Sequence, residues 1–382
     1  MSALILKHAL VFDDAFNPVS SDIAVDSEWI TEVGPGLSGA DSLDLSGQMI
    51  VPGFIDIHIH GCMGADTCDG TRQAIETIAR HLVENGVTSF CPPTMTIPPE
   101  QLKHAILTVR DCMLSPPDGA AVCGVNMEGP YISAHKKGAQ AATDIRVPDL
   151  EEFTRLYEET GRVIRLLDLA PECAPEGFIE GASKLCRISV AHSSADYDEV
   201  RRAFSQGARH ATHLYNAMTG FSHRAPGAVG AVLEDERVTA ELICDGQHLH
   251  PSVLRTSFRL LGDNRAVIIS DSMRAAGLPD GVSELGGQPV FVKNGHALLE
   301  DGTIAGSTTN LLAEIKNLLR FGIPFRQILR AATINPATVL GLEDSIGSIR
   351  AGKRADLVVL DQNYDISMVI ARGAVVYRRR QS

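Results

Sequence analysis

The chain has 382 residues, of which 44% are hydrophobic and 21% are charged, and its net charge is −13. This composition excludes a disordered, collagen-like or coiled-coil chain, and the negative charge opposes binding to nucleic acid or to an anionic membrane. At about 150 residues per domain, the length predicts two or three domains, or one α/β barrel of about 250 residues with a smaller module.

The N-terminus and the cysteines indicate in which cellular compartment we expect the protein. The first apolar run is broken at Lys7 and His8, and no segment approaches the roughly 20 apolar residues of a membrane span. The eight cysteines include no Cys-x-x-Cys pair, and a chain of this length needs no disulfide framework to build its core. We therefore expect reduced thiols in a cytoplasmic protein that is neither exported nor inserted into a membrane.

Both ends of the chain have the pattern of short antiparallel strands. Residues 1–49 contain the runs LILKHALVF, SDIAVD and WITEV, which are separated by Asp, Asn-Pro and Gly turns. Residues 341–382 contain two further runs of this kind, too few for a stable sheet of their own. We therefore expect the two ends to pair into one small β domain.

Between the ends, eight short apolar runs recur, and most are followed by a helix-like stretch. In residues 72–84, Ile75, Ile78, Ala79 and Leu82 fall on one helical face. Alternating strand and helix periods predict parallel βαβ units, and eight is the number that a (β/α)8 TIM barrel requires; an open doubly wound sheet is the alternative. The eight runs are IVPGFIDIHIH, VTSFCPPT, AAVCGVNMEG, VIRLLDLAP, RISVAHSS, RHATHLYNAM, TAELICDGQH and AVIISDSM.

The predicted catalytic domain spans residues 50–340. After Met273 the repeat stops: residues 278–302 predict an inserted turn-rich loop or hairpin, and residues 307–333 return to helix. No Gly-x-Gly-x-x-Gly follows a first strand, and no phosphate-loop Gly-Lys-Ser/Thr is present, which argues against nucleotide or dinucleotide chemistry.

Polar side chains interrupt the predicted strands at their C-terminal ends, where barrel enzymes place their active sites. Two histidines spaced one residue apart in an extended strand point to the same face, so both can reach one ion. Imidazoles with carboxylates suit Zn²⁺, Fe²⁺, Co²⁺ or Ni²⁺, and a carboxylate can bridge two ions. The six candidates are His58, His60, Glu128, His192, His213 and Asp271.

A single histidine outside such a constellation is more often a hydrogen-bonded structural residue than a ligand. That interpretation applies to five others: His8, His81, His104, His135 and His296. A His-x-His pair is also a weak motif alone, and it gains weight here from the other four candidates at successive strand ends.

The blocks PGFIDIHIHG, NMEGPYI, AHSSA, THLYNAM, HRAPG, DGQH and SDSMRAAG, in that order, resemble the N-acetylglucosamine-6-phosphate deacetylases of the amidohydrolase superfamily. The C-terminal GSIRAGKRADLVVLD resembles that superfamily's closing β segment. The resemblance covers nearly the whole chain. It implies a TIM barrel with a β-sandwich built from both termini, and a homodimer.

The resemblance also implies roles for individual residues. Glu128, His192 and His213 would be the principal metal ligands, with His58 and His60 favouring a second ion. Many amidohydrolases bridge their metals through a lysine on the fourth strand, which VIRLLDLAPE lacks, so Glu128 is the available substitute. Asp271 takes the place of the general base, which accepts a proton from the attacking water and delivers it to the leaving amine.

The anionic substrate requires a local positive site in an acidic protein. By resemblance the 6-phosphate is held by Asn216, Ala217, Arg224 and His248, with the arginine contributed by the neighbouring subunit. A surface salt bridge is the alternative role for Arg224, and in DGQHLHP either histidine could simply cap a loop.

One position departs from the family. Where these deacetylases carry Lys-Gly-Ala-His, this chain has Gln140 after Ala139. Glutamine donates a hydrogen bond to the scissile carbonyl but carries no positive charge. This difference leaves alternatives to N-acetylglucosamine 6-phosphate open: N-acetylgalactosamine 6-phosphate is one alternative, and another N-acyl or cyclic amide is a second. A non-catalytic assembly partner is a third, which the six retained candidate ligands disfavour.

Overall fold

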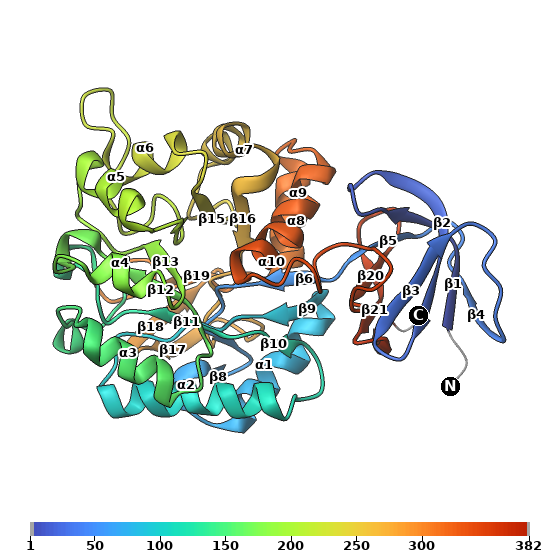
Figure 1. Cartoon of the computed structure of the whole chain (residues 1–382), viewed down its shortest axis with the longest axis horizontal. Helices are drawn as coiled ribbons and strands as arrows, with labels where there is room; N and C mark the ends of the chain where they lie inside the picture. The colour runs from blue at the N-terminus through green and yellow to red at the C-terminus, as the bar shows by residue number, and fades with distance from the viewer. Residues whose placement is uncertain (1–3, 380–382) are drawn as a thin grey trace.

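A β-sheet built from both ends of the chain forms one end of the molecule in the computed structural model, which describes residues 4–379 (Figure 1). Its strands are β1 (Leu4–Phe12), β2 (Pro18–Asp26), β3 (Trp29–Gly34), β4 (Asp41–Asp44), β5 (Met49–Pro52), β20 (Leu357–Leu360), β21 (Ile366–Ala371) and β22 (Ala374–Arg378). The order is β22-β21-β20-β5-β1-β2-β3, with β4 beside β1. Strand β5 pairs in parallel with β1 and antiparallel with β20, so it joins the two ends of the chain.

The middle of the chain contains parallel strands. They are β6 (Phe54–Asp56), β9 (Val87–Phe90), β10 (Ala121–Val122), β11 (Val125–Glu128), β12 (Ile164–Leu169), β13 (Arg187–Val190), β14 (His210–Ala211), β15 (Thr239–Ile243) and β16 (Ala266–Ile269). One sheet has the order β10-β9-β6, and the other runs from β11 to β16 in sequence order. Each of the eight predicted runs contains at least one of these strands, so the expectation of an α/β fold with consecutive parallel strands is confirmed.

Helices follow most of these strands and lie outside them (Figure 1). In α1 the Thr71 side chain accepts a hydrogen bond from the Ala74 N–H, which caps the helix, and the predicted face with Ile75 and Ile78 is buried. The helices are α1 (Arg72–Glu84), α2 (Pro99–Leu114), α3 (Leu150–Glu159), α4 (Phe178–Ala182), α5 (Tyr197–Gln206), α6 (Gly227–Glu234), α7 (Pro251–Arg265), α8 (Leu311–Arg320), α9 (Phe325–Ala332) and α10 (Ile334–Leu340).

Shorter elements surround the strand ends. The hairpin expected within residues 278–302 is present as an antiparallel sheet of three strands. The helical region expected over residues 307–333 is divided between α8 and α9. The remaining elements are β7 (Gly61–Cys62), β8 (Ala65–Asp66), β17 (Gly281–Leu285), β18 (Gln288–Lys293), β19 (His296–Leu298) and the 3₁₀ turns η1 (Thr67–Asp69), η2 (Ala134–Lys136), η3 (Ala142–Asp144) and η4 (Pro171–Cys173).

All eight cysteines lie within the described residues, and each is a free thiol, as the sequence predicts. Within residues 4–379, no helix combines the length and the apolar character that a membrane span requires.

Candidate metal centre and active site

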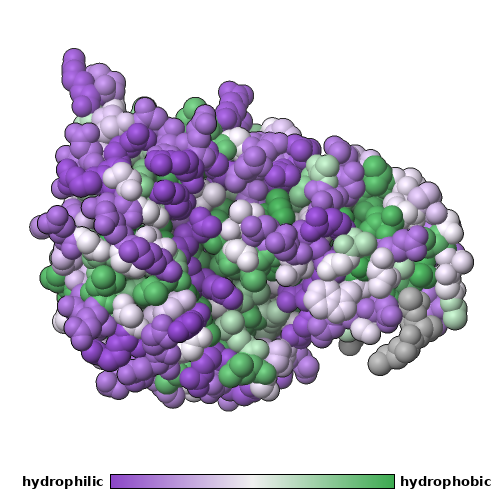
Figure 2. All heavy atoms as spheres, in the orientation of Figure 1, coloured by the Kyte–Doolittle hydropathy of each residue, from purple (hydrophilic) through white to green (hydrophobic). Residues whose placement is uncertain are grey.

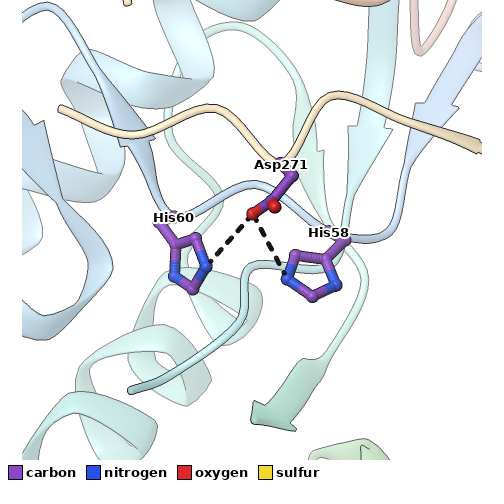
Figure 3. A group of neighbouring side chains, drawn as sticks. All are labelled: His58, His60 and Asp271. Carbon is purple, nitrogen blue, oxygen red and sulfur yellow. Dashed lines mark ion pairs between the residues drawn. The ribbon is translucent and has the colours of Figure 1, made fainter. Parts of the chain in front are cut away.

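Six buried side chains meet at the C-terminal ends of the parallel strands. They form two groups, and in each group the possible ligand atoms lie within 4.8 Å of one another. The first group comes from the segment after β6 and the segment after β16, as Figure 3 shows. The second comes from the ends of β11, β13 and β14. The groups are His58, His60 and Asp271, and Glu128, His192 and His213.

The backbone at these positions is unusual. His192, His213 and Asp271 each lie two residues beyond a strand and have φ values of +44°, +31° and +47°. A left-handed conformation costs a non-glycine residue on the order of 1–3 kcal/mol, so it persists only where its surroundings impose it. For Asp271 the surroundings include two main-chain hydrogen bonds: its N–H donates to the His58 carbonyl (2.9 Å), and its carbonyl accepts from the Ser307 N–H (2.7 Å).

Glu128 lies between the two groups and presents one oxygen to each. Its Oε1 is 2.8 Å from His192 Nε2 and 3.3 Å from His213 Nε2. Its Oε2 is 3.2 Å from His60 Nε2 and 3.6 Å from His58 Nε2. A carboxylate with this placement has the geometry of a bridge between two ions.

The nitrogen atoms are arranged for a cation. His192 Nδ1 lies 2.8 Å from the Lys136 carbonyl, which only accepts hydrogen bonds, so Nδ1 carries a proton. Nε2 faces Glu128 Oε1, to which it donates without an ion, and it offers a lone pair when an ion replaces that proton. That Nε2 is 3.2 Å from His213 Nε2. Among the described residues, the buried His58 Nε2 and Glu128 Oε2 have no hydrogen-bond partner. Converging lone pairs and unpartnered buried atoms fit a divalent ion with imidazole and carboxylate ligands.

The electrostatics of the site keep its carboxylates ionised. Burial raises the pKa of Glu128, but the charge of His58 and the hydrogen bonds from His192 and His213 outweigh burial and hold this pKa well below its usual range. The pKa of Asp271 is also lowered: burial raises it, but the hydrogen bond from His60 and the charges of His58, His60 and His213 together outweigh burial. Both side chains are therefore ready to bind a cation or to accept a proton.

Behind the ligands lies a carboxylate that sequence reasoning missed. Glu241 is fully buried on β15, and His58 Nδ1 and His210 Nε2 each lie 3.1 Å from its oxygens. Burial raises its pKa, but the nearby histidines outweigh burial and lower this pKa to about 2. The available signal was a single charged residue in the otherwise apolar run TAELIC, whose partners become apparent only in the folded chain.

A cavity of about 330 Å³ opens onto the centre. Its lining includes four of the predicted substrate-binding residues and every candidate ligand except His58. His135, which sequence reasoning interpreted as structural, also lines it. The four substrate-binding candidates are Gln140, Asn216, Ala217 and His248.

Several of these side chains are already oriented by the protein. Gln140 Oε1 accepts a hydrogen bond from the Thr96 N–H (2.7 Å). Asn216 Nδ2 donates to the carbonyls of His213 (3.1 Å) and Leu214 (3.4 Å), so its side-chain donors serve the turn. The neighbouring His250 caps α7, since its side chain accepts a hydrogen bond from the Ser252 N–H at the start of that helix.

The structure places Arg224 apart from this cavity. It lies exposed on the loop before α6. That loop projects from the molecule at upper left in Figure 1, and the projection is hydrophilic in Figure 2. Within this one chain, Arg224 is therefore not brought together with the other predicted substrate-binding residues.

Known proteins resemble the chain over most of its length. Residues 49–376 match the model of the amidohydrolase family. The N-acetylglucosamine-6-phosphate deacetylase of Bacillus subtilis is 36% identical over 88% of this chain and 86% of that protein. The N-acetylgalactosamine-6-phosphate deacetylase of Escherichia coli O157:H7 is 34% identical over 85% of this chain and 87% of that protein. An aspartate-to-alanine variant of the Mycobacterium smegmatis N-acetylglucosamine-6-phosphate deacetylase, solved with N-acetylglucosamine 6-phosphate, superposes with a TM-score of 0.91 at 30% identity, covering 98% of this chain and 100% of that one.

Proposed function

Because the chain belongs to the amidohydrolase family and, within it, to the N-acetylglucosamine-6-phosphate deacetylases, we propose that it hydrolyses N-acetylglucosamine 6-phosphate to glucosamine 6-phosphate and acetate. The observation that carries this proposal is the position of Glu128 between two groups of ligand atoms at one side of a cavity. An amide hydrolase of this kind needs an activated water and a polarised carbonyl in one place.

One or two divalent ions, from among Zn²⁺, Fe²⁺, Co²⁺ and Ni²⁺, would be held by the two groups of side chains. Glu128, His192 and His213 would bind the first ion, and His58 and His60 would complete a second position with Asp271. Such an ion, when bound, acidifies water towards a pKa of about 7 and polarises the amide carbonyl.

Asp271 would move the proton. Its ionised carboxylate accepts a proton from the water as the water oxygen attacks the acetamide carbon, and delivers that proton to the nitrogen as the C–N bond breaks. The products are acetate and the free amine. The support is the lowered pKa of Asp271 and its place beside the cavity, with Oδ1 3.4 Å from His60 Nε2.

Substrate contacts would come from both ends of the cavity. We propose that Gln140 donates from its amide nitrogen to the scissile carbonyl, since its Oε1 is already occupied by the Thr96 N–H. His248, Asn216 and the Ala217 main chain would hold the 6-phosphate. For Asn216 the contribution would be through its position in the turn, because its side-chain nitrogen already binds two carbonyls.

Arg224 would reach the phosphate of a second copy of the chain in a homodimer. The support is its exposure beside an apolar surface: Phe221 on the same loop is 65% exposed, and it borders a second cavity of about 440 Å³. An exposed aromatic residue beside an apolar cavity is typical of an interface between proteins.

The parallel strands would close into a (β/α)8 barrel. Support comes from contacts between the first and last of them: the Asp271 N–H binds the His58 carbonyl, and Ser270 Oγ donates to Asp56 Oδ2 (2.6 Å). We propose residues 50–340 as the barrel and residues 1–49 with 341–382 as a β-sandwich; residues 1–3 and 380–382 lie outside the described residues. The eight free thiols fit a reducing compartment such as the cytoplasm.

Acetate release from purified protein tests the proposal. The substrates are N-acetylglucosamine 6-phosphate, its galactosamine epimer, unphosphorylated N-acetylglucosamine and an N-acetyl amino acid, and the bound metal is measured in the same sample. We expect the highest kcat/KM with the first substrate. A higher value with the epimer would favour the second candidate, which the Escherichia coli relative supports. Release from none of the four would contradict the proposal.

A further inference from the structure

Glu241 contacts the metal centre from behind. Its Oε2 lies 3.1 Å from His58 Nδ1 and accepts the main-chain N–H of His213 at 3.1 Å. Its Oε1 lies 3.1 Å from His210 Nε2. One carboxylate thus touches a ligand from each of the two groups, although it lines no part of the cavity.

These contacts determine which nitrogen of His58 faces the centre. A carboxylate only accepts hydrogen bonds, so His58 Nδ1 carries a proton, and in the neutral ring Nε2 is the nitrogen with the lone pair. That Nε2 lies 3.6 Å from both Glu128 Oε2 and Asp271 Oδ1. Without an acceptor behind it, the ring would be free to place its proton on Nε2, and the nitrogen would then be unable to bind an ion.

The carboxylate is itself anchored. His210 Nδ1 lies 2.6 Å from Thr239 Oγ1, so Thr239, His210 and Glu241 form a chain of hydrogen-bonded side chains along neighbouring strands. His210 lies on β14 and Thr239 and Glu241 lie on β15, and Glu241 and His210 are fully buried. Burying a carboxylate costs free energy unless it is fully hydrogen-bonded, and an apolar side chain would fill the same buried strand position at lower cost. A glutamate at this position therefore points to a role for its carboxylate beyond packing.

We propose that Glu241 is a positioning residue that holds His58 as a ligand of the second ion and ties the two groups of ligands together. The inference rests on the metal centre of the proposed function. Partners behind metal-binding histidines orient them, and their removal typically costs 10- to 100-fold in metal affinity.

The test is a metal titration of chelator-stripped protein against a competing chromophoric chelator, with Zn²⁺ as the probe. Glu241→Gln keeps the shape of the side chain but replaces one acceptor oxygen with a donor. We expect the variant to keep the first ion and to bind the second about 10- to 100-fold more weakly. Unchanged affinity for the second ion would overturn the proposal, as would a wild-type protein that binds only one ion.

Glu314→Gln is the matched control. Glu314 on α8 is also a fully buried carboxyl, and among the described residues neither of its side-chain oxygens has a hydrogen-bond partner. Because no hydrogen bond or ion pair joins it to a candidate ligand among the described residues, we expect its variant to bind both ions as the wild-type protein does. Equal losses in both variants would mean that any buried carboxyl has this effect, which would refute a specific role.

A double-mutant cycle distinguishes a specific effect of Glu241 on His58 from a non-specific disturbance of the structure around the metal centre. His58→Gln should bind the second ion measurably more weakly, and adding Glu241→Gln should weaken it no further, because the two residues act as one unit. Additive losses would overturn the proposal. If Glu241→Gln does not fold, Glu241→Asp, which keeps the charge on a shorter side chain, serves in the same titration and should weaken the second ion.

The titrations use no substrate, so this inference and the proposed function fail separately. Wild-type protein that binds two ions but releases no acetate would contradict the deacetylase and leave the role of Glu241 intact. Conversely, if the protein is an active deacetylase and Glu241→Gln leaves its affinity for the second ion unchanged, this inference alone is contradicted.

Discussion

Asp245 Oδ2 lies 2.8 Å from His248 Nδ1, and Asp245 Oδ1 accepts the main-chain N–H of the same histidine at 2.9 Å. The carboxylate therefore determines the orientation of the His248 ring and which ring nitrogen carries a proton. His248 Nδ1 carries the proton, and His248 lines the cavity.

This pair predicts a pH dependence of substrate binding. Burial lowers the pKa of His248, but the hydrogen bond and charge of Asp245 outweigh burial and raise it. Histidine ordinarily has a pKa near 6.5, and a raised pKa keeps the His248 imidazolium charged at pH values above 6.5. The attraction of His248 for phosphate is therefore lost only as the pH rises through the raised pKa. In Asp245→Asn that loss should occur at lower pH.

The measurement is KM for the phosphorylated substrate between about pH 5.5 and 9. We expect similar values for the two proteins at the acidic end, where both rings are charged, and a higher KM for Asp245→Asn near pH 7. The titration of the substrate phosphate is common to both proteins and cancels in the comparison. Superimposed profiles would show that Asp245 does not control the charge of His248.

Asp271→Asn should remove the proton carrier. Because general acid–base catalysis typically contributes 10²- to 10⁴-fold, we expect kcat to fall by at least about 100-fold. Metal analysis should still find the first ion, whose three ligands are unchanged. A near-normal kcat would assign Asp271 a structural role and contradict the proposed mechanism.

Arg224→Ala should weaken substrate binding. Loss of a hydrogen bond to a charged group costs about 1.5–3 kcal/mol, which corresponds to a KM increase of roughly 10- to 150-fold. Arg202, exposed on α5, provides the control, and its alanine variant should leave KM unchanged. An unchanged KM for Arg224→Ala would remove this residue from the phosphate site.

Mixing two impaired variants, assayed at a substrate concentration well below the KM of Arg224→Ala, tests which subunit supplies the arginine. In a hybrid dimer of Arg224→Ala with Asp271→Asn, the first chain keeps its Asp271 and receives Arg224 from its partner. Random exchange of equal amounts would restore about a quarter of the wild-type sites. No recovery after verified subunit exchange would show that Arg224 acts within its own chain.

Gln140→Glu tests the proposed donor to the carbonyl. The new side chain still accepts from the Thr96 N–H but presents an oxygen where the amide nitrogen was, so kcat/KM should fall about 10-fold or more. Gln140→His places an imidazole at this position, as in the family, and should increase the rate if glutamine is a handicap. Unchanged kcat/KM in Gln140→Glu would exclude Gln140 from the reaction.

Metal removal should affect stability as well as turnover. A ligand present at 1,000 times its Kd stabilises the folded state by about 4 kcal/mol, so exhaustive chelation should abolish acetate release and lower Tm. Adding back one divalent ion at a time should restore both and identify the metal. Full activity and an unchanged Tm after chelation would contradict the metal centre.

The strands and the candidate ligands could be predicted from local pattern. Short apolar runs that end in His58, Glu128, His192 or Asp271 are visible along the chain, because strand length, turn residues and polar interruptions are properties of neighbouring residues. The hairpin within residues 278–302 was predictable for the same reason.

The partners of the ligands were not predictable in this way. Glu241 is 183 residues from His58 along the chain, and a single glutamate within a strand has no pattern that identifies its contacts. For Arg224, closeness in sequence did not predict closeness in space. It is close in sequence to Asn216, yet it lies on an exposed loop outside the cavity.

The sequence by itself determined the chemical inventory of this protein: the alternating strands and helices, and the imidazoles and carboxylates at the strand ends. Only the tertiary structure decided how those groups divide, with Glu128 presenting one oxygen to each group and Glu241 and Asp245 orienting histidines from behind. The physical reason is that hydrogen bonds and ion coordination depend on distances of about 3 Å across separate strands, which the spacing of residues along one strand does not specify.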